Sequence, residues 1–303
     1  FPTRRSSDLG GTTARGLAVQ NPASMAVVAL SADGTQLIRF ASATPGTTRL
    51  ASLTAPMTPL NVITGVTTGE TLVGIDFRPA TGQLYALGVD HMADKGTVYR
   101  LDPQNGMATV IGTAGSIAFV SATDGTAVDL PDPDTAGYGF DFNPAVDRIR
   151  VTTSTGLNFR LNQLTGTAVD GDGVASPAGT PANTVNGINP DGGINVAGAA
   201  SGVSGAAYTN SVASPTPPPM GPLPITTLYA LSEAGSQLTI QNAPNAGTQT
   251  VPLTVRLGGS TLAFTSVNGF DIPSDVRVSA NNAAVTSGSG FAALTVAGVT
   301  SLY

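Results

Sequence analysis

Two aspartates stand at equivalent places in a repeated sequence pattern and are the first candidates for chemistry. Asp76 lies in the string G-I-D-F-R-P, and Asp141 lies in the string G-F-D-F-N-P. Strongly apolar residues flank each carboxylate, so burial in a sheet would require a partner, because an unpaired buried charge is very costly. The pattern therefore predicts either a structurally paired carboxylate or part of a binding site.

The turns that follow these strings predict the cross-strand neighbours of both aspartates. Folding each hairpin about its turn gives the pairs Asp141 with Arg150, Asn143 with Arg148, Asp76 with Tyr85 and Arg78 with Gln83. The simplest interpretation is structural. Asp141 and Arg150 neutralise each other, or the aspartate accepts hydrogen bonds from backbone N–H groups at the edge of a sheet.

An excess of arginine in the second copy supports a functional alternative. Three guanidiniums in one sheet could bind a carboxylate, sulfate or phosphate through bidentate contacts, which suggests an anionic-ligand site near the axis of the fold. The candidate ligand-binding residues are Asp76, Arg78, Asp141, Asn143, Arg148, Arg150, Asn158 and Arg160.

The sequence predicts no cofactor, and calcium is the one candidate that its acidic loops leave open. Asp170 and Asp172 in V-D-G-D-G-V resemble part of an oxygen-rich calcium loop, although the downstream Glu of an EF-hand is absent. A second acidic loop contains Asp124, Asp129, Asp132 and Asp134. Turn chemistry explains many such Asp-Gly pairs without a metal.

Most enzyme classes are disfavoured by the residues that the chain lacks. His91 is the only histidine and there is no cysteine, which excludes zinc sites with several His or Cys ligands. A Ser-His-Asp triad would have to use His91, and no G-x-S-x-G elbow accompanies it. We therefore expect a binding or interaction scaffold of unknown ligand. Carboxylate chemistry remains, so the alternative is a calcium-assisted or carboxylate-based hydrolase or lyase acting at a central channel.

A repeat of about 65 residues predicts the architecture that positions these side chains. The strings at Gly74 and Gly139 are 65 residues apart, a third copy, G-F-D-I-P, begins at Gly269, and a degenerate copy begins at Gly205. Residues 71–113 give four strands separated by Pro- and Asn-Gly-containing turns, which is the size of one propeller blade. We expect an all-β fold: a β-propeller of about five four-stranded blades, the last one truncated, rather than a β-sandwich or an irregular solenoid.

Composition agrees with this fold and limits the partners. Hydrophobic residues make up 41% and charged residues 11% of the 303 residues, with 37 Gly and 22 Pro for tight turns. A net charge of −6 with Lys95 as the only lysine disfavours nucleic acid, and no apolar stretch is long enough to span a bilayer. We expect a monomer that binds an unknown protein or a small anionic ligand.

The two ends of the sequence look artificial. The first nine residues resemble a translated sequencing adapter, so residues 1–24 are expected to be artefactual or disordered and residues 25–303 to form a single propeller-like domain. The chain ends within a predicted strand, and we interpret it as a fragment.

Several strings resemble a bacterial family catalogued as domain of unknown function 4394. The most specific are G-E-T-L-V-G-I-D-F-R-P-A-T-G-Q-L-Y-A-L-G from Gly69 and G-F-D-F-N-P-A-V-D-R-I-R-V from Gly139. Members are commonly exported proteins with propeller-like repeats, so the resemblance implies an extracytoplasmic setting, with the signal peptide missing from this fragment. The Pro-rich segment 211–224 and the segment 273–290 depart from the family pattern, and the resemblance implies no catalytic residues.

Overall fold

The computed structural model describes residues 7–8, 14–19, 26–42, 61–171, 187–196, 199–213 and 225–303. Within this part of the chain there is no α-helix, and the one helical turn is a short 3-10 element, Pro244–Ala246. Five antiparallel sheets form the blades of a β-propeller, which confirms the predicted fold class. No helix in the described ranges has the length and apolar character needed to cross a membrane.

Each blade is a sheet whose first strand lies innermost. Blade 1 contains β2 (Ala14–Val19), β3 (Ala26–Ser31), β4 (Gln36–Ala41) and β5 (Asn61–Val62). Blade 2 contains β6 (Thr71–Phe77), β7 (Leu84–Asp90), β8 (Lys95–Leu101) and β9 (Ala108–Val110). Blade 3 contains β10 (Tyr138–Asn143), β11 (Arg148–Thr153), β12 (Asn158–Leu161) and β13 (Ala168–Val169).

The last two blades have the same order with additions. Blade 4 contains β16 (Gly205–Tyr208), β17 (Leu228–Ser232), β18 (Gln237–Gln241) and β19 (Thr248–Thr254), and it is extended by β14 (Asn195–Val196) and β15 (Ala199–Ala200). Blade 5 contains β22 (Ser266–Asp271), β23 (Phe291–Val296), β24 (Val299–Leu302) and β1 (Ser7–Asp8). A separate hairpin joins β20 (Arg256–Leu257) to β21 (Ser260–Thr261).

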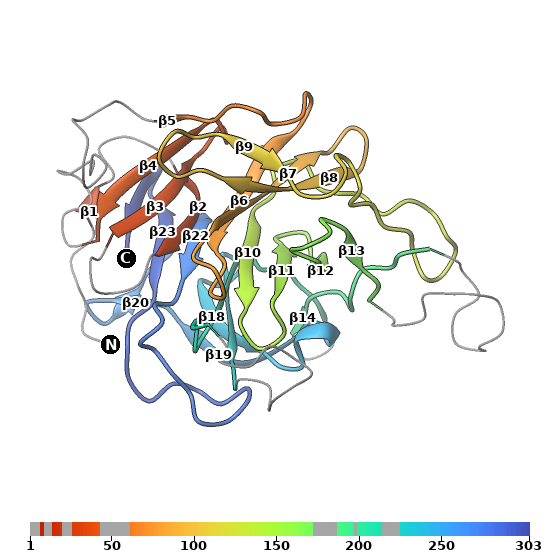
Figure 1. Ribbon diagram of the computed structural model, residues 1–303. Helices are drawn as coiled ribbons and strands as arrows, with labels where there is room; N and C mark the ends of the chain where they lie inside the picture. The colour runs from red at the N-terminus through yellow and green to blue at the C-terminus, as the bar shows by residue number, and fades with distance from the viewer. Residues whose placement is uncertain are drawn as a thin grey trace.

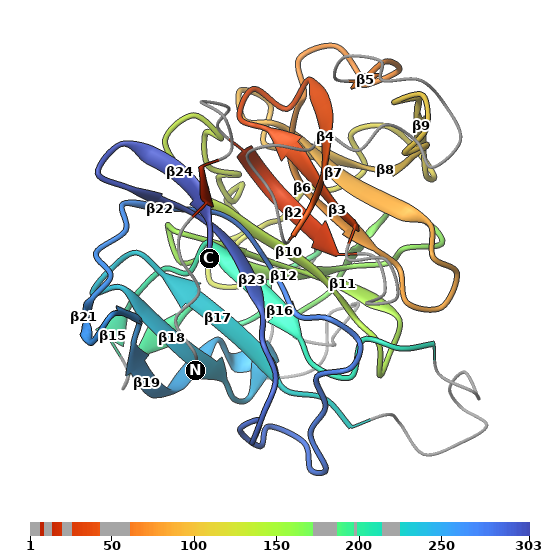
Figure 2. The same cartoon turned by 90° about the vertical axis from the view of Figure 1, so that its left-hand side faces the viewer.

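The inner strands form a closed ring. Strand β2 contacts β6, β6 contacts β10, β10 contacts β16, β16 contacts β22, and β22 contacts β2 again. Figure 1 shows β2, β6, β10 and β22 at the centre, with β4, β9 and β13 at the periphery. Blades 1, 5 and 4 follow one another around the ring in Figure 2. Because each sheet is covered on both faces by its neighbours, β6 and β7 are buried almost throughout, as expected for near-continuous apolar strands.

The hairpin turns set the register that brings the polar residues together. In blade 2 the chain reverses at Gly82, which has φ +69°, and the N–H groups of Thr81 and Gly82 donate to the carbonyl oxygen of Arg78. The predicted pairs are confirmed: Asp141 lies opposite Arg150, Asn143 opposite Arg148 and Asp76 opposite Tyr85, while the N–H of Arg78 donates to Gln83.

A glycine in every inner strand allows the ring to be narrow. The five are Gly16, Gly74, Gly139, Gly205 and Gly269, and a Cβ atom on any of them would press against the next inner strand. At Gly139 that Cβ would lie 2.9 Å from the backbone nitrogen of Ala206, and at Gly269 it would lie 2.5 Å from that of Leu17. The residue two positions later points to the same side of its strand, so it also faces the next inner strand.

Two expectations about the chain ends were wrong. Residues 14–19, which the sequence placed in an artefactual or disordered segment, form β2, the inner strand of blade 1. Gly16-Leu17-Ala18 matches the repeated pattern with alanine in place of aspartate, so the pattern is too weak there to predict the strand. Blade 5 is not a truncated sheet, because β1 pairs with β24 as its fourth strand. Strand β5 forms the outer edge of blade 1.

The segment 273–290, which departs from the family pattern, lies against blade 4. The side chain of Asn210 donates to the carbonyl oxygen of Val278 and accepts from its N–H, at 3.1 and 2.9 Å. The N–H of Thr226 donates to Asn281, and the Tyr229 hydroxyl accepts from the N–H of Val285. The long connection between β22 and β23 therefore ties blade 5 to blade 4. Most of the Pro-rich segment, 214–224, lies outside the described residues.

Candidate functional site

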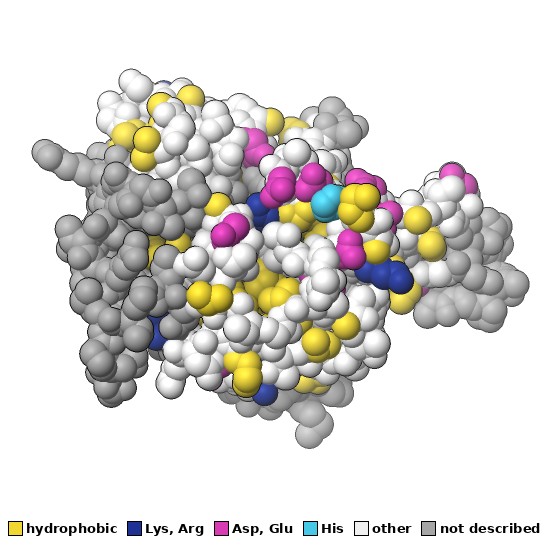
Figure 3. Space-filling model, turned by 90° about the horizontal axis from the view of Figure 1, so that it is seen from above, with side chains coloured by type: hydrophobic (Ala, Val, Ile, Leu, Met, Phe, Trp, Pro, Cys, Tyr) yellow, Lys and Arg dark blue, Asp and Glu magenta, His cyan; other side chains and the backbone are white. Residues whose placement is uncertain are grey.

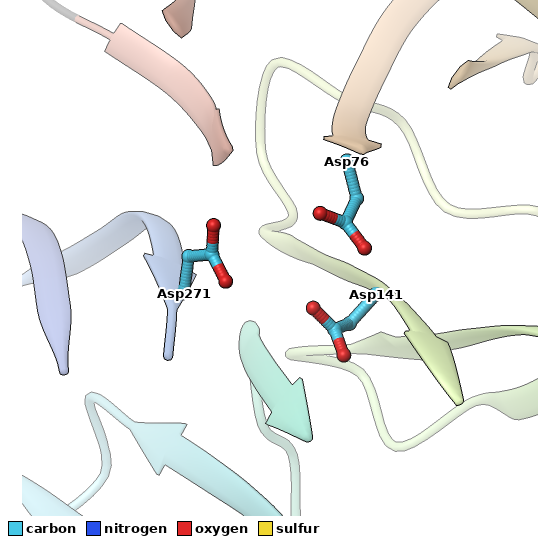
Figure 4. Close-up of side chains that lie close together, drawn as sticks. All are labelled: Asp76, Asp141 and Asp271. Carbon is cyan, nitrogen blue, oxygen red and sulfur yellow. The ribbon is translucent and has the colours of Figure 1, made fainter. Parts of the chain in front are cut away.

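Three aspartates from three different blades converge where the inner strands meet. Asp76 belongs to β6, Asp141 to β10 and Asp271 to β22, and each offers one carboxylate oxygen such that the three oxygens lie within 4.8 Å of one another. Figure 4 shows the three carboxylates turned toward one another across the space between the strands. Within the described part of the chain, no other group of three acidic or histidine side chains is close enough to share a metal ion.

The inner strands hold two of these carboxylates by backbone hydrogen bonds. Oδ2 of Asp76 accepts from the N–H of Phe142 in the next blade, and Oδ2 of Asp141 accepts from the N–H of Tyr208 in the blade after that, both at 2.8 Å. This is one of the two structural arrangements expected from the sequence, the one in which the aspartate accepts backbone N–H groups. Each carboxylate therefore also joins two neighbouring blades.

Burial and mutual repulsion make ionisation of these groups unfavourable. Asp76, Asp141 and Asp271 are only 5%, 4% and 5% exposed. Loss of hydration raises the pKa of Asp76 well above its usual value, and the nearby Asp271 carboxylate raises it further. Burial likewise raises the pKa of Asp141, with added repulsion from Asp76 and Asp271. Near neutral pH the site therefore needs either shared protons or a cation.

The other two inner strands carry alanine at the corresponding place. Ala18 in β2 and Ala207 in β16 are both fully buried. Three of five equivalent positions thus provide a carboxylate, and the two remaining ones provide only a methyl group. The site is one-sided: blades 2, 3 and 5 supply the charge, whereas blades 1 and 4 supply none at this level.

The predicted arginines have another partner, Asp191, which the sequence did not reveal. Arg150 donates through Nη1 to Asp191 at 2.5 Å and to Asn158 at 2.8 Å, and through Nη2 to Asn245 at 2.5 Å. Arg160 binds both oxygens of the same carboxylate, at 2.7 and 2.8 Å. The Asp191 side chain is completely buried. Arg150 therefore lies opposite Asp141 as predicted, but its head group ion-pairs with Asp191.

The remaining predicted ligands lie elsewhere. The guanidinium of Arg78 forms an ion pair with Asp147, which links blade 2 to blade 3. Arg148 donates to the carbonyl oxygen of Asp147 and to Gln163, and Asn143 accepts the N–H of Ala145 in the turn after β10. The eight candidates are thus divided among the axis, the pair of Arg78 with blade 3, the turn end of blade 3 itself and the group around Asp191.

The loop proposed for calcium is only partly described. Oδ1 of Asp170 accepts the N–H of Asn189 at 3.2 Å, whereas Asp172 lies outside the described residues. On the face shown in Figure 3, acidic side chains lie beside the single histidine, and the other acidic loop reaches it through Asp132. Nδ1 of His91 lies 3.8 Å from Asp132 there, and Arg15 pairs with Asp134 at 3.3 Å.

Sequence reasoning missed two residues of these sites for different reasons. Asp271 stands in the third copy of the repeat, so the pattern alone could have added it to Asp76 and Asp141. Asp191 stands in a Gly- and Asn-rich connection 41 residues after Arg150, and no local pattern signals their contact.

Comparison with known proteins places the chain in a family. Residues 36–303 match the family described as Domain of unknown function (DUF4394). The chain belongs to the DUF4394 family. A search of curated proteins finds no match for this DUF4394 chain.

Two solved structures are similar to this chain at low sequence identity. Glutaminyl cyclase from Myxococcus xanthus is 9% identical, with a TM-score of 0.50, over 99% of this chain and 94% of that one. A Thermus thermophilus protein described as a putative oxidoreductase (glucose dehydrogenase) is 11% identical, with a TM-score of 0.46, over 99% of both chains. At such identities the first similarity concerns the fold alone, and the second supports no argument.

Proposed function

We propose that this DUF4394 protein is an extracytoplasmic binding scaffold whose propeller is held together at its axis by a divalent cation, most simply calcium. The observation that carries the proposal is the convergence of Asp76, Asp141 and Asp271, three buried carboxylates from three blades, on one point. The outer parts of the blades would then be available for a protein or small-ligand partner.

The carboxylate set suits calcium in both chemistry and size. Calcium binds carboxylate and carbonyl oxygens at about 2.3 to 2.6 Å, so two oxygens on opposite sides of the ion lie about 4.6 to 5.2 Å apart. Oxygens within 4.8 Å of one another fall in the range that one such ion can reach. A divalent cation would reduce the charge of three ionised carboxylates from −3 to −1, which removes most of their repulsion.

Burial favours a structural role for these carboxylates over a catalytic one. A general acid, base or nucleophile must come within hydrogen-bonding distance of a substrate, and side chains that are 4–5% exposed present almost no surface to one. A cation bound here would instead join blades 2, 3 and 5. This reasoning favours the scaffold over a hydrolase or lyase that uses the same aspartates.

The extracytoplasmic setting rests on the family resemblance and is compatible with calcium. Extracellular calcium modules bind with dissociation constants of about 10⁻⁴ to 10⁻³ M, matched to the calcium available outside the cell.

Thermal unfolding in calcium and in chelator tests the proposal. At a calcium concentration about 100 times the dissociation constant, binding to the folded state adds about 2.7 kcal/mol of stability, so the melting temperature should rise by several degrees. The rise should disappear when Asp76, Asp141 and Asp271 are all changed to Asn. Asp170→Asn is the matched control, because it removes a carboxylate from the alternative loop and should leave the rise unchanged. Equal melting temperatures of the unaltered protein in calcium and chelator would contradict the proposal.

A further inference from the structure

The chain contains three Asn-Gly pairs, and they lie in different surroundings. They are Asn105-Gly106, Asn186-Gly187 and Asn268-Gly269. Asn105 is exposed in the turn between β8 and β9, Asn268 is part-buried within β22, and Asn186 lies outside the described residues. An asparagine before glycine can react with the main chain, because glycine has no side chain to shield its backbone nitrogen. The structure therefore separates one accessible pair from one enclosed pair.

The turn that contains Asn105 brings its side-chain carbonyl group close to the backbone of Gly106. Oδ1 of Asn105 accepts the N–H of Met107 at 2.8 Å, so the side chain curls back over the intervening glycine. Gly106 has φ +78°, a left-handed conformation that glycine adopts without strain. Its N–H donates to the carbonyl oxygen of Asp102 at 2.8 Å, and this hydrogen bond must open before the nitrogen reacts.

The pair at Asn268 is held more firmly. Nδ2 of Asn268 donates to Oγ1 of Thr295 at 2.8 Å, which fixes the amide against β23. Gly269 lies in the ring of inner strands, where an added Cβ would be 2.5 Å from the backbone nitrogen of Leu17. A ring formed between the Asn268 side chain and the Gly269 nitrogen would have to displace the neighbouring strand. The packing therefore protects this pair.

We propose that Asn105 is a site of spontaneous deamidation, which slowly converts this turn after synthesis. The backbone nitrogen of Gly106 attacks Cγ of Asn105, a C–N bond forms, and Nδ2 leaves as ammonia with the proton from the attacking nitrogen. Water then opens the resulting succinimide at either of its carbonyl groups, which leaves aspartate or isoaspartate at position 105. The reaction requires only water and is independent of the proposed cation at the axis.

The modification weakens the contact between blades 1 and 2. Isoaspartate inserts a methylene group into the main chain beside Gly106, whose carbonyl oxygen accepts the N–H of Thr64 at 3.1 Å. An added Cβ at Gly106 would lie only 2.4 Å from the carbonyl oxygen of Val62, so the turn packs closely against the end of blade 1. A lengthened main chain has to move away from that end, and the hydrogen bond from Thr64 is then lost.

Blade 3 contains the same turn without the reactive residue. Gly166 has φ +70°, and its N–H donates to the carbonyl oxygen of Asn162 at 2.8 Å, as the N–H of Gly106 does in blade 2. Thr165 stands in the place of Asn105. Since threonine fits before the glycine of this turn, Asn105→Thr is a variant that should keep the fold and cannot form a succinimide.

Ageing the purified full chain in mildly alkaline buffer, followed by peptide mass spectrometry, tests the proposal. Conversion at Asn105 should exceed conversion at Asn268 by about tenfold or more, because the enclosed pair must first open locally. A sample kept unfolded in urea is the control, since both pairs should convert there. Lack of conversion at Asn105 once the unfolded sample has converted, or equal conversion of the two pairs in the folded protein, would overturn the proposal.

Melting curves measure the effect of the modification on the fold. Aged protein should melt about 2 to 4 °C below fresh protein, as expected for the loss of about one backbone hydrogen bond. Asn105→Thr should begin near the melting temperature of the fresh protein and decline less on ageing. An equal decline in the variant would contradict the role of Asn105, because the change would then arise elsewhere in the chain.

Discussion

The propeller buries charge in two different ways, at its axis and between blades 3 and 4. At the axis, Asp76, Asp141 and Asp271 bring like charges together. Between the blades, the Asp191 carboxylate receives two guanidiniums and completes a network of short hydrogen bonds. Asp191 and Arg150 are as deeply buried as the axial aspartates, and only Arg160 is partly exposed, so the main difference lies in the counter-charge.

The comparison teaches that burial alone does not decide what a charged residue does. An ion pair with good geometry is complete within the protein, and removing one partner leaves the other charge without compensation. A set of like charges is incomplete, and it needs protons or a cation from solution. The same chemical change, Asp to Asn, should therefore have opposite effects in the two regions.

The largest effect is expected at Asp191. Asp191→Asn removes the counter-charge of Arg150 and Arg160, and breaking a buried ion pair in this way costs about 3 to 5 kcal/mol of unfolding free energy. Urea denaturation at neutral pH measures this loss. Asp147→Asn is the matched control, because its pair with Arg78 is partly exposed and should contribute about 1 kcal/mol or less. Equal losses of unfolding free energy in the two variants would show that the buried pair of Asp191 stabilises the protein no more than the partly exposed pair of Asp147.

A smaller effect of opposite sign is expected at Asp141. In chelator at pH 7.5, Asp141→Asn should stabilise the protein by about 1.4 kcal/mol for each pH unit by which folding raises the pKa of Asp141, because it removes one of three repelling charges and retains an oxygen that accepts the Tyr208 N–H. The same variant should lose most of the calcium-dependent rise in melting temperature. Destabilisation in chelator would show that the axis, like Asp191, already contains its counter-charge.

The smallest expected effect is a decrease, at acidic pH, of the stabilisation that Asp141→Asn gives in chelator. The pKa of Asp141 is raised in the folded state, so the stability linked to its proton is fully present below the unfolded pKa of about 3.9 and is lost as pH rises through the folded pKa. In chelator, the difference in unfolding free energy between Asp141→Asn and the unaltered protein should therefore fall toward zero between pH 7.5 and pH 4. Denaturation curves at several pH values measure it, and a difference independent of pH would contradict the raised pKa.

The sequence predicted local pairing much better than it predicted partners across blades. Turn residues such as Gly82 and the alternation in β10 and β11 fix hairpin register, so the neighbours Asp141 and Arg150 followed directly. The direction of the Arg150 head group did not follow, because its ion-pair partner comes from a connection whose path depends on the packing of blades 3 and 4.

The repeated sequence pattern predicts only part of the axial site. The nearly identical strings predict Asp76 and Asp141 as an equivalent pair, whereas the third copy is shorter and does not by itself place Asp271 in the same site. Strand β2 was missed, since Ala18 replaces the aspartate that makes the other copies visible and its neighbours in the chain looked artefactual. The convergence itself depends on the number of blades, and pattern reasoning gave that only approximately.

The glycine in each inner strand has a consequence for how this family can diversify. Because Gly16, Gly74, Gly139, Gly205 and Gly269 set the bore of the ring, the diameter stays constant whatever residue stands two places later. Those five later positions are structurally equivalent. Three of them carry aspartate, and the other two carry alanine, at Ala18 and Ala207. Single substitutions at these positions could therefore change the net charge at the propeller axis, one charge at a time, while the blades keep their arrangement.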